Sequence, residues 1–329
     1  MSIMFKENSK PIIAVIASCI LFGMIGIFVR EIKDMGPGSI LFYRLYFGFA
    51  ALLSYFIIIG EVKDLKFKQK RYYLLLLGIL NTVCTFAYFS AIKHIGIPVS
   101  VLLLYTAPIY VTFLSPFLLK ERITVRDTLA LTLSISGILL AVNPANLSGI
   151  AVSGGIADNT LGIIFGIISG LCYGCTIMMV NYLKDIYSPV EQIFWSTSVS
   201  LILLLPFGIS VSGPVLFENL KILIPLGIIA TAFASLLYMR GVSQIKAQTA
   251  AVISLLEPVS SIVFCCMLLG EPMQPNTLGG CIFILAGAFF VAYEIPRWPE
   301  LLNKFNGKWN TQKRETREEY NEEKCPQKT

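Results

Sequence analysis

Residues 88–124 read YFSAIKHIGIPVSVLLLYTAPIYVTFLSPFLLKERIT, and residues 238–274 read YMRGVSQIKAQTAAVISLLEPVSSIVFCCMLLGEPMQ. The two stretches align without a gap at an offset of 150 residues, and Pro108 in the first falls on Pro258 in the second. Weak internal similarity of this kind is typical of membrane folds built from two copies of one structural unit. The similarity therefore decides how the chain is divided.

The similarity extends toward the beginning of each copy. CILFGMIGIFVREIKD at residues 19–34 resembles GLCYGCTIMMVNYLKD at residues 170–185, at an offset of 151 residues. Agreement near both ends of the unit, with a shift of only one residue between them, indicates a duplication. We therefore predict a first repeat at 11–143 and a second repeat at 160–294.

The composition places most of the chain in a membrane. The sequence is 55% hydrophobic and only 14% charged, with a mean hydropathy of +0.73, whereas a soluble domain carries about 25% charged residues. A membrane-spanning helix needs about 20 predominantly apolar residues, and such runs recur along the sequence. Bounded by charges, Pro and Gly, the predicted spans are 11–30, 38–60, 72–92, 98–118, 126–143, 160–183, 189–211, 220–240, 247–269 and 275–294.

These spans leave five helices in each copy. Because five is an odd number, the second copy must enter the membrane upside down relative to the first. Inverted repeats are a common transporter architecture, in which the substrate binds near the membrane midplane at the repeat interface. We therefore predict an all-α polytopic membrane protein with ten transmembrane helices in two inverted five-helix repeats. A simple duplicated bundle is the alternative.

The positive charges fall on one side of this predicted topology. With a cytoplasmic N-terminus, 21 Lys and Arg residues lie in the two tails and in the loops at 61–71, 120–126, 184–188 and 240–246, whereas four lie in the loops on the other side. Cytoplasmic loops carry this excess in membrane proteins. We predict a multi-pass protein of the cell membrane with cytoplasmic tails at 1–10 and 295–329, the second of them charged and disordered.

Several classes of partner and cofactor are not expected. The net charge of +6 follows from the cytoplasmic loops and does not indicate a nucleic-acid partner. The eight cysteines fall almost wholly in apolar runs, where they act as small packing residues. His94 is the only histidine, so we expect no metal, and the sequence contains no nucleotide-binding loop. The expected partners are the lipid bilayer and a small-molecule substrate, without a cofactor.

Four short motifs carry a resemblance to a known family. The first copy contains TAP at 106–108 and LKER at 119–122, and the second contains LEPV at 256–259 and LGEP at 269–272. In this order and spacing the chain resembles the EamA-type branch of the drug/metabolite transporter superfamily over about 11–294. The resemblance implies ten helices around a central cavity and the export or uptake of small metabolites, often amino acids.

Glu257 stands in the middle of a predicted span, about ten residues or 15 Å from either membrane surface. A carboxylate at this depth costs about 2.5–3.5 kcal/mol on insertion scales, so we expect it to face a wet cavity, to have a partner or to be protonated. The first copy departs from this pattern, with Ala107 at the equivalent position. We hypothesise that Glu257 binds a cationic group of the substrate or takes up a proton. The alternative is a protonated side chain that bonds to a neighbouring backbone.

Arg44 is the complementary charge in the first repeat, about six residues or 9 Å inside its span, and its repeat partner is Trp195. An arginine at this depth can reach the interface with its side chain, so interfacial contact and substrate contact both stay open. A cavity with an arginine toward one side and a carboxylate at its middle suits a zwitterion. We therefore expect an amino acid or a similar small polar metabolite as the substrate.

Aromatic and amide side chains complete the predicted substrate site. The aromatic residues inside the spans whose polar atoms need partners are Tyr88, Tyr105, Trp195 and Tyr238. Asn81 is a polar residue within an apolar helix. We expect each of them in the cavity wall, and packing within the helix bundle is the alternative for any one.

Pro108 and Pro258 are predicted to kink two equivalent spans. Each proline removes the hydrogen bond to the carbonyl group four residues earlier, at Leu104 or Ser254. Freed carbonyl groups at membrane depth are tolerated where protein or cavity water satisfies them. We therefore expect both kinks beside the cavity, with helix packing alone as the alternative.

Glycines indicate where helices pack closely. One stripe along a helix face consists of Gly162, Gly166, Gly170 and Gly174, and such stripes let backbones approach each other. Gly137 and Gly287 are equivalent in the two copies and are expected to serve helix packing or a homodimer face. Glu121 and Glu271 end two equivalent spans, and we interpret them as caps or hinges.

Three functions are compared. The first is a secondary transporter that moves a small polar metabolite by alternating access, driven by protons, another ion or the substrate gradient. The second is a membrane-embedded enzyme, which is disfavoured because the sequence has no acidic pair for Mg²⁺, no His cluster and no nucleophile beside a base. The third is a membrane scaffold or sensor that recruits partners through its C-terminal tail. We predict the transporter and keep the scaffold as the alternative.

Overall fold

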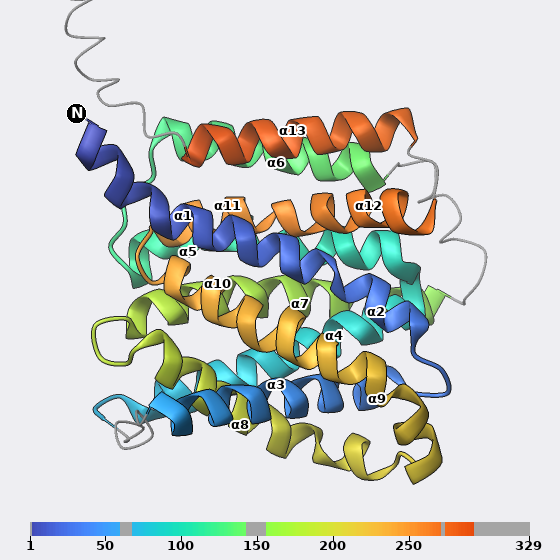
Figure 1. Cartoon of the computed structure of the whole chain (residues 1–329). Coiled ribbons are helices and arrows are strands. Elements are labelled where there is room, and N and C mark those ends of the chain that lie inside the picture. Colours follow the sequence, from blue (N-terminus) through green and yellow to red (C-terminus); the bar gives the residue numbers. More distant parts are fainter. Residues whose placement is uncertain (1, 60–67, 143–155, 271–273, 293–329) are drawn as a thin grey trace, which may run out of the picture. The chain divides into compact units, whose positions relative to one another are not determined.

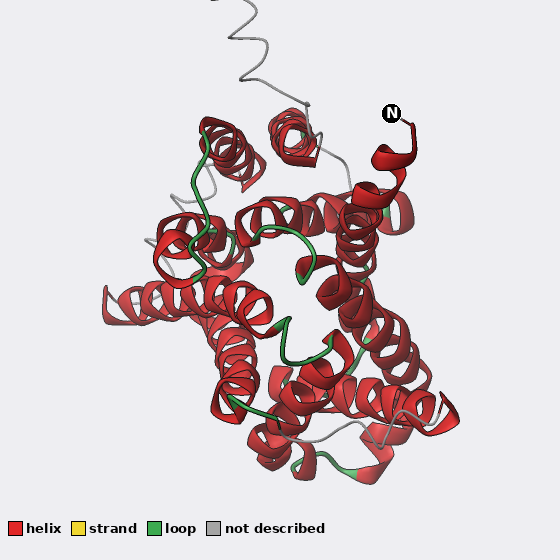
Figure 2. Ribbon diagram, turned by 90° about the vertical axis from the view of Figure 1, so that its left-hand side faces the viewer, coloured by secondary structure: helices red, strands yellow, loops and turns green. Residues whose placement is uncertain are grey.

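Apolar runs separated by short polar loops form helices throughout the part of the chain that the computed structural model describes, which is residues 2–59, 68–142, 156–270 and 274–292 (Figure 1). Within these ranges no strand is present (Figure 2). In this described part of the chain, eight helical segments are long and apolar enough to cross a membrane. The protein is therefore an all-helical, multi-pass membrane protein.

The helices follow one another with few intervening residues. Their bounds are α1 Ser2–Gly23, α2 Ile25–Glu31, α3 Pro37–Ile59, α4 Arg71–Leu104, α5 Ala107–Leu118, α6 Val125–Val142, α7 Ile156–Leu183, α8 Pro189–Ile209, α9 Gly213–Gly227, the π-helix η3 Ile228–Phe233, α10 Ala234–Val242, α11 Ala247–Ser254, α12 Leu256–Leu269 and α13 Pro275–Ala292. Continuous apolar sequence allows α9, η3 and α10 to follow one another without a loop.

Every predicted span is mainly helical in its described residues, but not every span meets the length and hydropathy needed to cross a membrane. The apolar helix Pro275–Val291 is shorter than the eight candidates, and α6 is not one of them. Ten crossings therefore stay a prediction. At the N-terminus, α1 begins at Ser2, so most of the segment 1–10 that we expected to be a tail is helical. The predicted tail at 295–329 lies outside the described residues.

The two equivalent spans that contain Pro108 and Pro258 are both interrupted. Between α4 and α5 the helix breaks at residues 105–106, and α5 has Pro108 in its first turn. Between α11 and α12 the break falls at Leu255, three residues before Pro258. A proline cannot donate to the carbonyl of the preceding turn, and this is the physical reason for a break at these places.

Helix α4 packs along α7 in two directions. Tyr73 makes a ring contact with Tyr182, and the Cys84 thiol contacts the carbonyl of Ser169, so the first part of α4 is antiparallel to α7. The chain turns after Ile95, and the next candidate span, Val99–Leu118, runs parallel to α7. Leu103 packs at Gly166 and Ala107 at Gly174, and a Cβ atom added at Gly174 would lie 3.2 Å from the Ala107 carbonyl oxygen. The glycine stripe of α7 therefore serves close helix packing.

Helices α6 and α13 form a pair in which equivalent residues exchange contacts (Figure 1). A Cβ atom added at Gly137 would lie 2.7 Å from the carbonyl oxygen of Gly280, and one at Gly287 would lie 2.8 Å from the carbonyl oxygen of Ala130. In the repeat alignment Gly137 corresponds to Gly287 and Ala130 to Gly280. The two contacts are therefore copies of one another, and the helices run antiparallel.

The loops gather at two ends of the bundle. At the first end, which we name the basic end, Lys68 pairs with Glu191, Asn181 donates to the carbonyl of Ile245, and Glu121 accepts from the backbone of Ala247. At the opposite end the Asn219 amide exchanges hydrogen bonds with the backbone of Lys33. The predicted cytoplasmic loops that the structure describes thus lie together, away from residues 33–39.

The α6–α13 contact predicts opposite effects for two neighbouring glycines. A Cβ atom at Gly280 would lie 2.5 Å from the Gly137 carbonyl oxygen, whereas one at Gly279 meets nothing within 4 Å. We expect Gly280→Ala to lower the stability in detergent by about 1–3 kcal/mol through overpacking. Gly279→Ala should be neutral or stabilising by up to about 1 kcal/mol, because alanine favours helix. Thermal unfolding followed by circular dichroism measures both, and equal melting temperatures would contradict the described contact.

Candidate functional site

A cavity of about 120 Å³ lies between helices from both halves of the chain. We name it the Arg44 cavity. Its lining comprises Phe22 of α1; Arg44, Leu45, Gly48, Phe49 and Leu52 of α3; Asn81 of α4; Ile193, Ser196 and Thr197 of α8; Ala230, Thr231 and Ala232 of η3; and Ser235 and Met239 of α10. The wall is therefore mainly apolar, with one cation and a few hydroxyl and amide groups.

Two of the predicted site residues, Arg44 and Asn81, line this cavity. Arg44 is half-buried, and its Nε atom is fully buried without a hydrogen-bond partner among the described residues. The Arg44 turn of α3 is held in place by close backbone packing, since a Cβ atom at Gly227 would lie 3.0 Å from the Arg44 carbonyl oxygen. A buried guanidinium donor without a partner is a group that a ligand can satisfy.

Glu257 is not part of the lining of this cavity but lies within electrostatic reach of Arg44. The Tyr105 hydroxyl is within hydrogen-bonding reach of the Glu257 carboxyl group. The other side chains close enough to interact electrostatically with Glu257 are Cys19, Cys84, Tyr88, Tyr173 and Tyr238. These groups come from α1, α3, α4, α7 and α10, so the carboxyl group lies where elements of both halves meet.

Tyr238 supports the interrupted span that carries Glu257. Its hydroxyl and the Ser254 hydroxyl are 3.1 Å apart, and the Ser254 hydroxyl also donates to the carbonyl of Ala250. The Tyr238 ring packs edge-on against Phe22, a residue of the cavity wall. Tyr238 is buried and therefore links the end of α11 to the cavity from behind.

Trp195 is placed apart from the other predicted site residues. It packs against the buried cluster of Leu74, Leu183 and Tyr187 and is not among the residues that line the Arg44 cavity. The repeat alignment pairs Trp195 with Arg44, but the neighbouring Ser196 points into the cavity instead. The structure thus brings together Arg44, Asn81, Tyr88, Tyr105, Tyr238 and Glu257, and it leaves Trp195 outside this group.

Four polar lining residues, Ser196, Thr197, Thr231 and Ser235, were not identified from the sequence. The polar triplet at 196–198 within an apolar span is the signal that could have found the first two. Thr231 lies in η3, and its hydroxyl donates to the carbonyl of Leu226, five residues earlier. Short π-helical segments are frequent at functional sites, and this one turns residues 230–232 toward the cavity.

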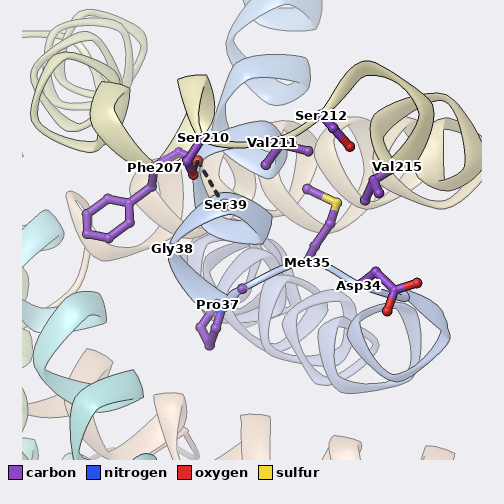
Figure 3. Close-up of a pocket in the computed structure, with 11 residues that line it drawn as sticks. Asp34, Met35, Pro37, Gly38, Ser39, Phe207, Ser210, Val211, Ser212 and Val215 are labelled. Carbon is purple, nitrogen blue, oxygen red and sulfur yellow. Dashed lines mark hydrogen bonds between the residues drawn. The ribbon is translucent and has the colours of Figure 1, made fainter.

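A second, larger cavity of about 460 Å³ lies at the end opposite to the basic end (Figure 3). It is formed by the loop before α3 and by residues between the end of α8 and the start of α9. The Ser39 hydroxyl donates to the carbonyl of Phe207 at its edge, and the Met35 side chain points toward Val211 (Figure 3). This loop cavity contains no group that pairs with Glu257 and is separate from the Arg44 cavity.

The Arg44 cavity offers binding groups. A guanidinium group, an amide and several hydroxyl groups face it, with a carboxyl group nearby. Among the described residues no three His, Cys, Asp or Glu side chains are grouped in a way that could hold a metal ion. A mainly apolar pocket with a few fixed polar groups is the usual form of a small-molecule site.

The fold and this site define the class of the protein, a multi-pass helical membrane protein with a small, mainly apolar cavity between its two halves that contains a few polar groups. Within that class, the model of the EamA-like transporter family matches residues 9–143 and 160–293. The chain belongs to this family.

Relatives agree with this assignment. An uncharacterized transporter of Archaeoglobus fulgidus is 31% identical over 276 residues, covering 83% of this chain and 93% of the relative. The uncharacterized transporter YxxF of Bacillus subtilis is 25% identical, covering 87% and 90% of the two chains. Human solute carrier family 35 member G1 is 23% identical over 42% of this chain and 37% of its own. One solved crystal structure matches with a TM-score of 0.72 at 17% identity, covering 86% of this chain and 96% of the other, and shows a shared fold.

The proximity of Arg44 and Glu257 predicts energetic coupling. Arg44→Gln leaves the carboxyl group without its cation, and Glu257→Gln does the reverse. We expect each single variant to have a lower free energy of unfolding than the wild type. The loss in the double variant should be smaller than the sum of the two single losses by about 1 kcal/mol or more. As a control, Arg44→Gln is combined with Glu121→Gln, because the Glu121 carboxyl group lies at the basic end. The losses in unfolding free energy of these two variants should add within about 0.5 kcal/mol. Unfolding in detergent measures the four variants, and additivity for Arg44 and Glu257 would show that they do not interact.

Proposed function

We propose that this protein is a secondary transporter that moves a small zwitterionic metabolite, such as an amino acid, by alternating access. The observation that carries the proposal is the Arg44 guanidinium donor, which lines a cavity between the halves and has no hydrogen-bond partner among the described residues, with the Glu257 carboxyl group within electrostatic reach of it. The carboxylate of the substrate would bind Arg44, and its ammonium group would face Glu257. Charge-assisted hydrogen bonds of this kind are stronger than neutral ones.

In inverted-repeat transporters, alternating access arises when the two halves exchange equivalent contacts. Several contacts in this protein support such inverted repeats. The α6–α13 pair is related by a two-fold exchange of equivalent residues, with the helices antiparallel. Similarly, Gly23 packs against Ser260 as Gly174 packs against Tyr110, at equivalent positions of the two copies. The two separate matches to the family model give further support to the division of the chain.

The size of the Arg44 cavity is consistent with a closed conformation. Ligand sites usually enclose about 300–1,000 Å³, whereas this cavity measures about 120 Å³. A substrate would enter after the halves move apart on one side. The excess of Lys and Arg at the basic end supports a cytoplasmic location for that end, with both termini on the same side of the cell membrane.

Transport in proteoliposomes tests this proposal. We expect uptake of a zwitterionic amino acid from a metabolite panel, with competition by other zwitterions and none by neutral N-acetyl amides. Arg44→Gln should raise KM about tenfold or more, because it removes a charge-assisted contact. Trp195→Phe serves as the control and should transport like the wild type, since Trp195 does not line the cavity. Competition by neutral analogues alone would contradict the zwitterion site.

Glu257 is proposed to bind the proton that couples transport to a pH gradient. We expect wild-type uptake to respond to an imposed gradient and Glu257→Gln uptake not to respond, because glutamine cannot exchange a proton. Counterflow without a gradient, measured on both proteins, separates loss of coupling from loss of binding. An undiminished response of Glu257→Gln to the gradient would rule out this role.

A further inference from the structure

The end of α5 is joined to the beginning of α11 at the basic end. Helix α5 ends in a left-handed turn at Lys120, with φ of 57°, and the backbone of Glu121 bonds back to the carbonyl of Ser115. This αL termination brings the Glu121 carboxyl group to the first residue of α11. Its Oε1 atom accepts a hydrogen bond of 3.1 Å from the backbone N–H of Ala247.

A second hydrogen bond lies beside the first. The Gln248 amide nitrogen donates to the Ser115 hydroxyl at 2.7 Å, and both side chains are buried. Neither the Glu121 Oε2 atom nor the Gln248 Oε1 atom has a hydrogen-bond partner among the described residues. One partly buried bond from a side chain to the backbone and one buried bond between two side chains therefore tie α5 to α11. We name the pair Glu121–Ala247 and Ser115–Gln248 the basic-end clamp.

The charges around Glu121 favour its carboxylate form in the clamp. Lys246 precedes Ala247, and Lys184 follows the end of α7, and both attract the carboxylate. Burial acts in the opposite direction and raises the pKa of Glu121 above its ordinary value. On the far side of the same loop, the Asn181 amide donates to the carbonyls of Val242 and Ile245. The segment before α11 is therefore fixed from both sides.

Helix α11 is only eight residues long and connects the clamp to the break at Leu255. Glu257 is the second residue after that break. Because α11 lies between the clamp and this break, release of Ala247 and Gln248 would leave α11 free to move as a short rigid unit about the break, without unfolding α12. The clamp therefore holds in place the helix that leads to Glu257.

The repeat alignment shows that the clamp is asymmetric. At the positions that correspond to Ser115 and Gln248, the other copy has Cys265 and Pro98. A proline has neither a backbone N–H nor a side-chain amide, and a thiol is a weak hydrogen-bond partner. The residue types at these two positions therefore do not allow the amide-to-hydroxyl bond that Gln248 makes to Ser115. The Ser115–Gln248 bond is a feature of the basic end alone in the repeat alignment.

We propose that the basic-end clamp is the gate that keeps this end of the protein closed and biases the resting transporter toward access from the opposite end. The proposal rests on the alternating access proposed above. Its test is independent of the substrate, because the opening of the gate is measured by chemical labelling and not by transport.

The experiment uses a variant whose native cysteines are replaced and which carries Ser196→Cys in the buried cavity wall. An impermeant maleimide is applied to sealed vesicles from either side, and Arg122→Cys in a parallel sample identifies the side of the basic end. We expect Glu121→Ala to raise labelling of the cavity cysteine from the basic end about tenfold, since it removes a hydrogen bond to a charged group. Gln248→Met, which keeps the side-chain length, should raise labelling by about threefold or more through loss of a neutral hydrogen bond.

Glu218→Ala is the matched control, because Glu218 is exposed and has no part in the clamp. In the clamp variants, labelling of the cavity cysteine from the opposite end should stay equal or fall, because a protein that is open at the basic end is closed at the other end.

Wild-type labelling rates in both Glu121→Ala and Gln248→Met would overturn the gate. An equal rise in labelling from both ends would also overturn it, because that result indicates a loss of packing throughout the protein. If Glu121→Ala does not fold, the Gln248→Met result decides. A wild type that opens and closes in this assay but transports no zwitterion would overturn only the proposed substrate.

Discussion

A carboxyl group in the middle of an apolar helix bundle is the constraint on which the arrangement of this protein depends. Burial of a charge at this depth is unfavourable unless it is neutralised or paired. Here Glu257 has the Tyr105 hydroxyl at hydrogen-bonding reach and Arg44 within electrostatic reach. Because these groups belong to α12, to the end of α4 and to α3, the pairing requires both halves of the chain to meet at this point. The site and the fold therefore depend on the same contact.

Interruptions of two helices place the groups of this contact where the backbone can bend. A continuous helix would satisfy its own backbone and leave only side chains to face a cavity. The breaks at 105–106 and at Leu255 place Tyr105 and Glu257 beside the interruptions, where the backbone can bend. The π-helical turn at 228–233 acts similarly, since it brings three successive residues to the cavity wall. Close glycine packing of α1 and α7 then holds the interrupted spans in place without large side chains at the contact.

Hydropathy was sufficient to predict the helices, and the repeat was sufficient to predict the equivalent breaks. Orientation around each helix was harder to predict, because a membrane helix is apolar on all sides and lacks the polar stripe that marks an outward face in soluble proteins. Arg44 and Asn81, which line the cavity, were selected from the sequence because they are conspicuously polar. Trp195 was assigned to the site as an aromatic residue whose polar atom needs a partner inside the membrane, yet the residue next to it, Ser196, lines the cavity instead. Serines and threonines were missed because their hydroxyl groups can bond to the preceding turn of their own helix.

The clamp illustrates a further limit of sequence reasoning. Glu121 and Ala247 are 126 residues apart, and the acceptor contacts a backbone N–H, which leaves no trace in the identity of residue 247. A cap was the natural interpretation of Glu121, and it does cap a helix, but the helix belongs to the other half of the chain. Once this contact is known, the comparison of the two copies gains meaning, since Pro98 and Cys265 remove a bond that Gln248 and Ser115 make. Duplication supplies two similar segments, and small differences in sequence between the copies allow one of them a side-chain hydrogen bond that the other cannot make.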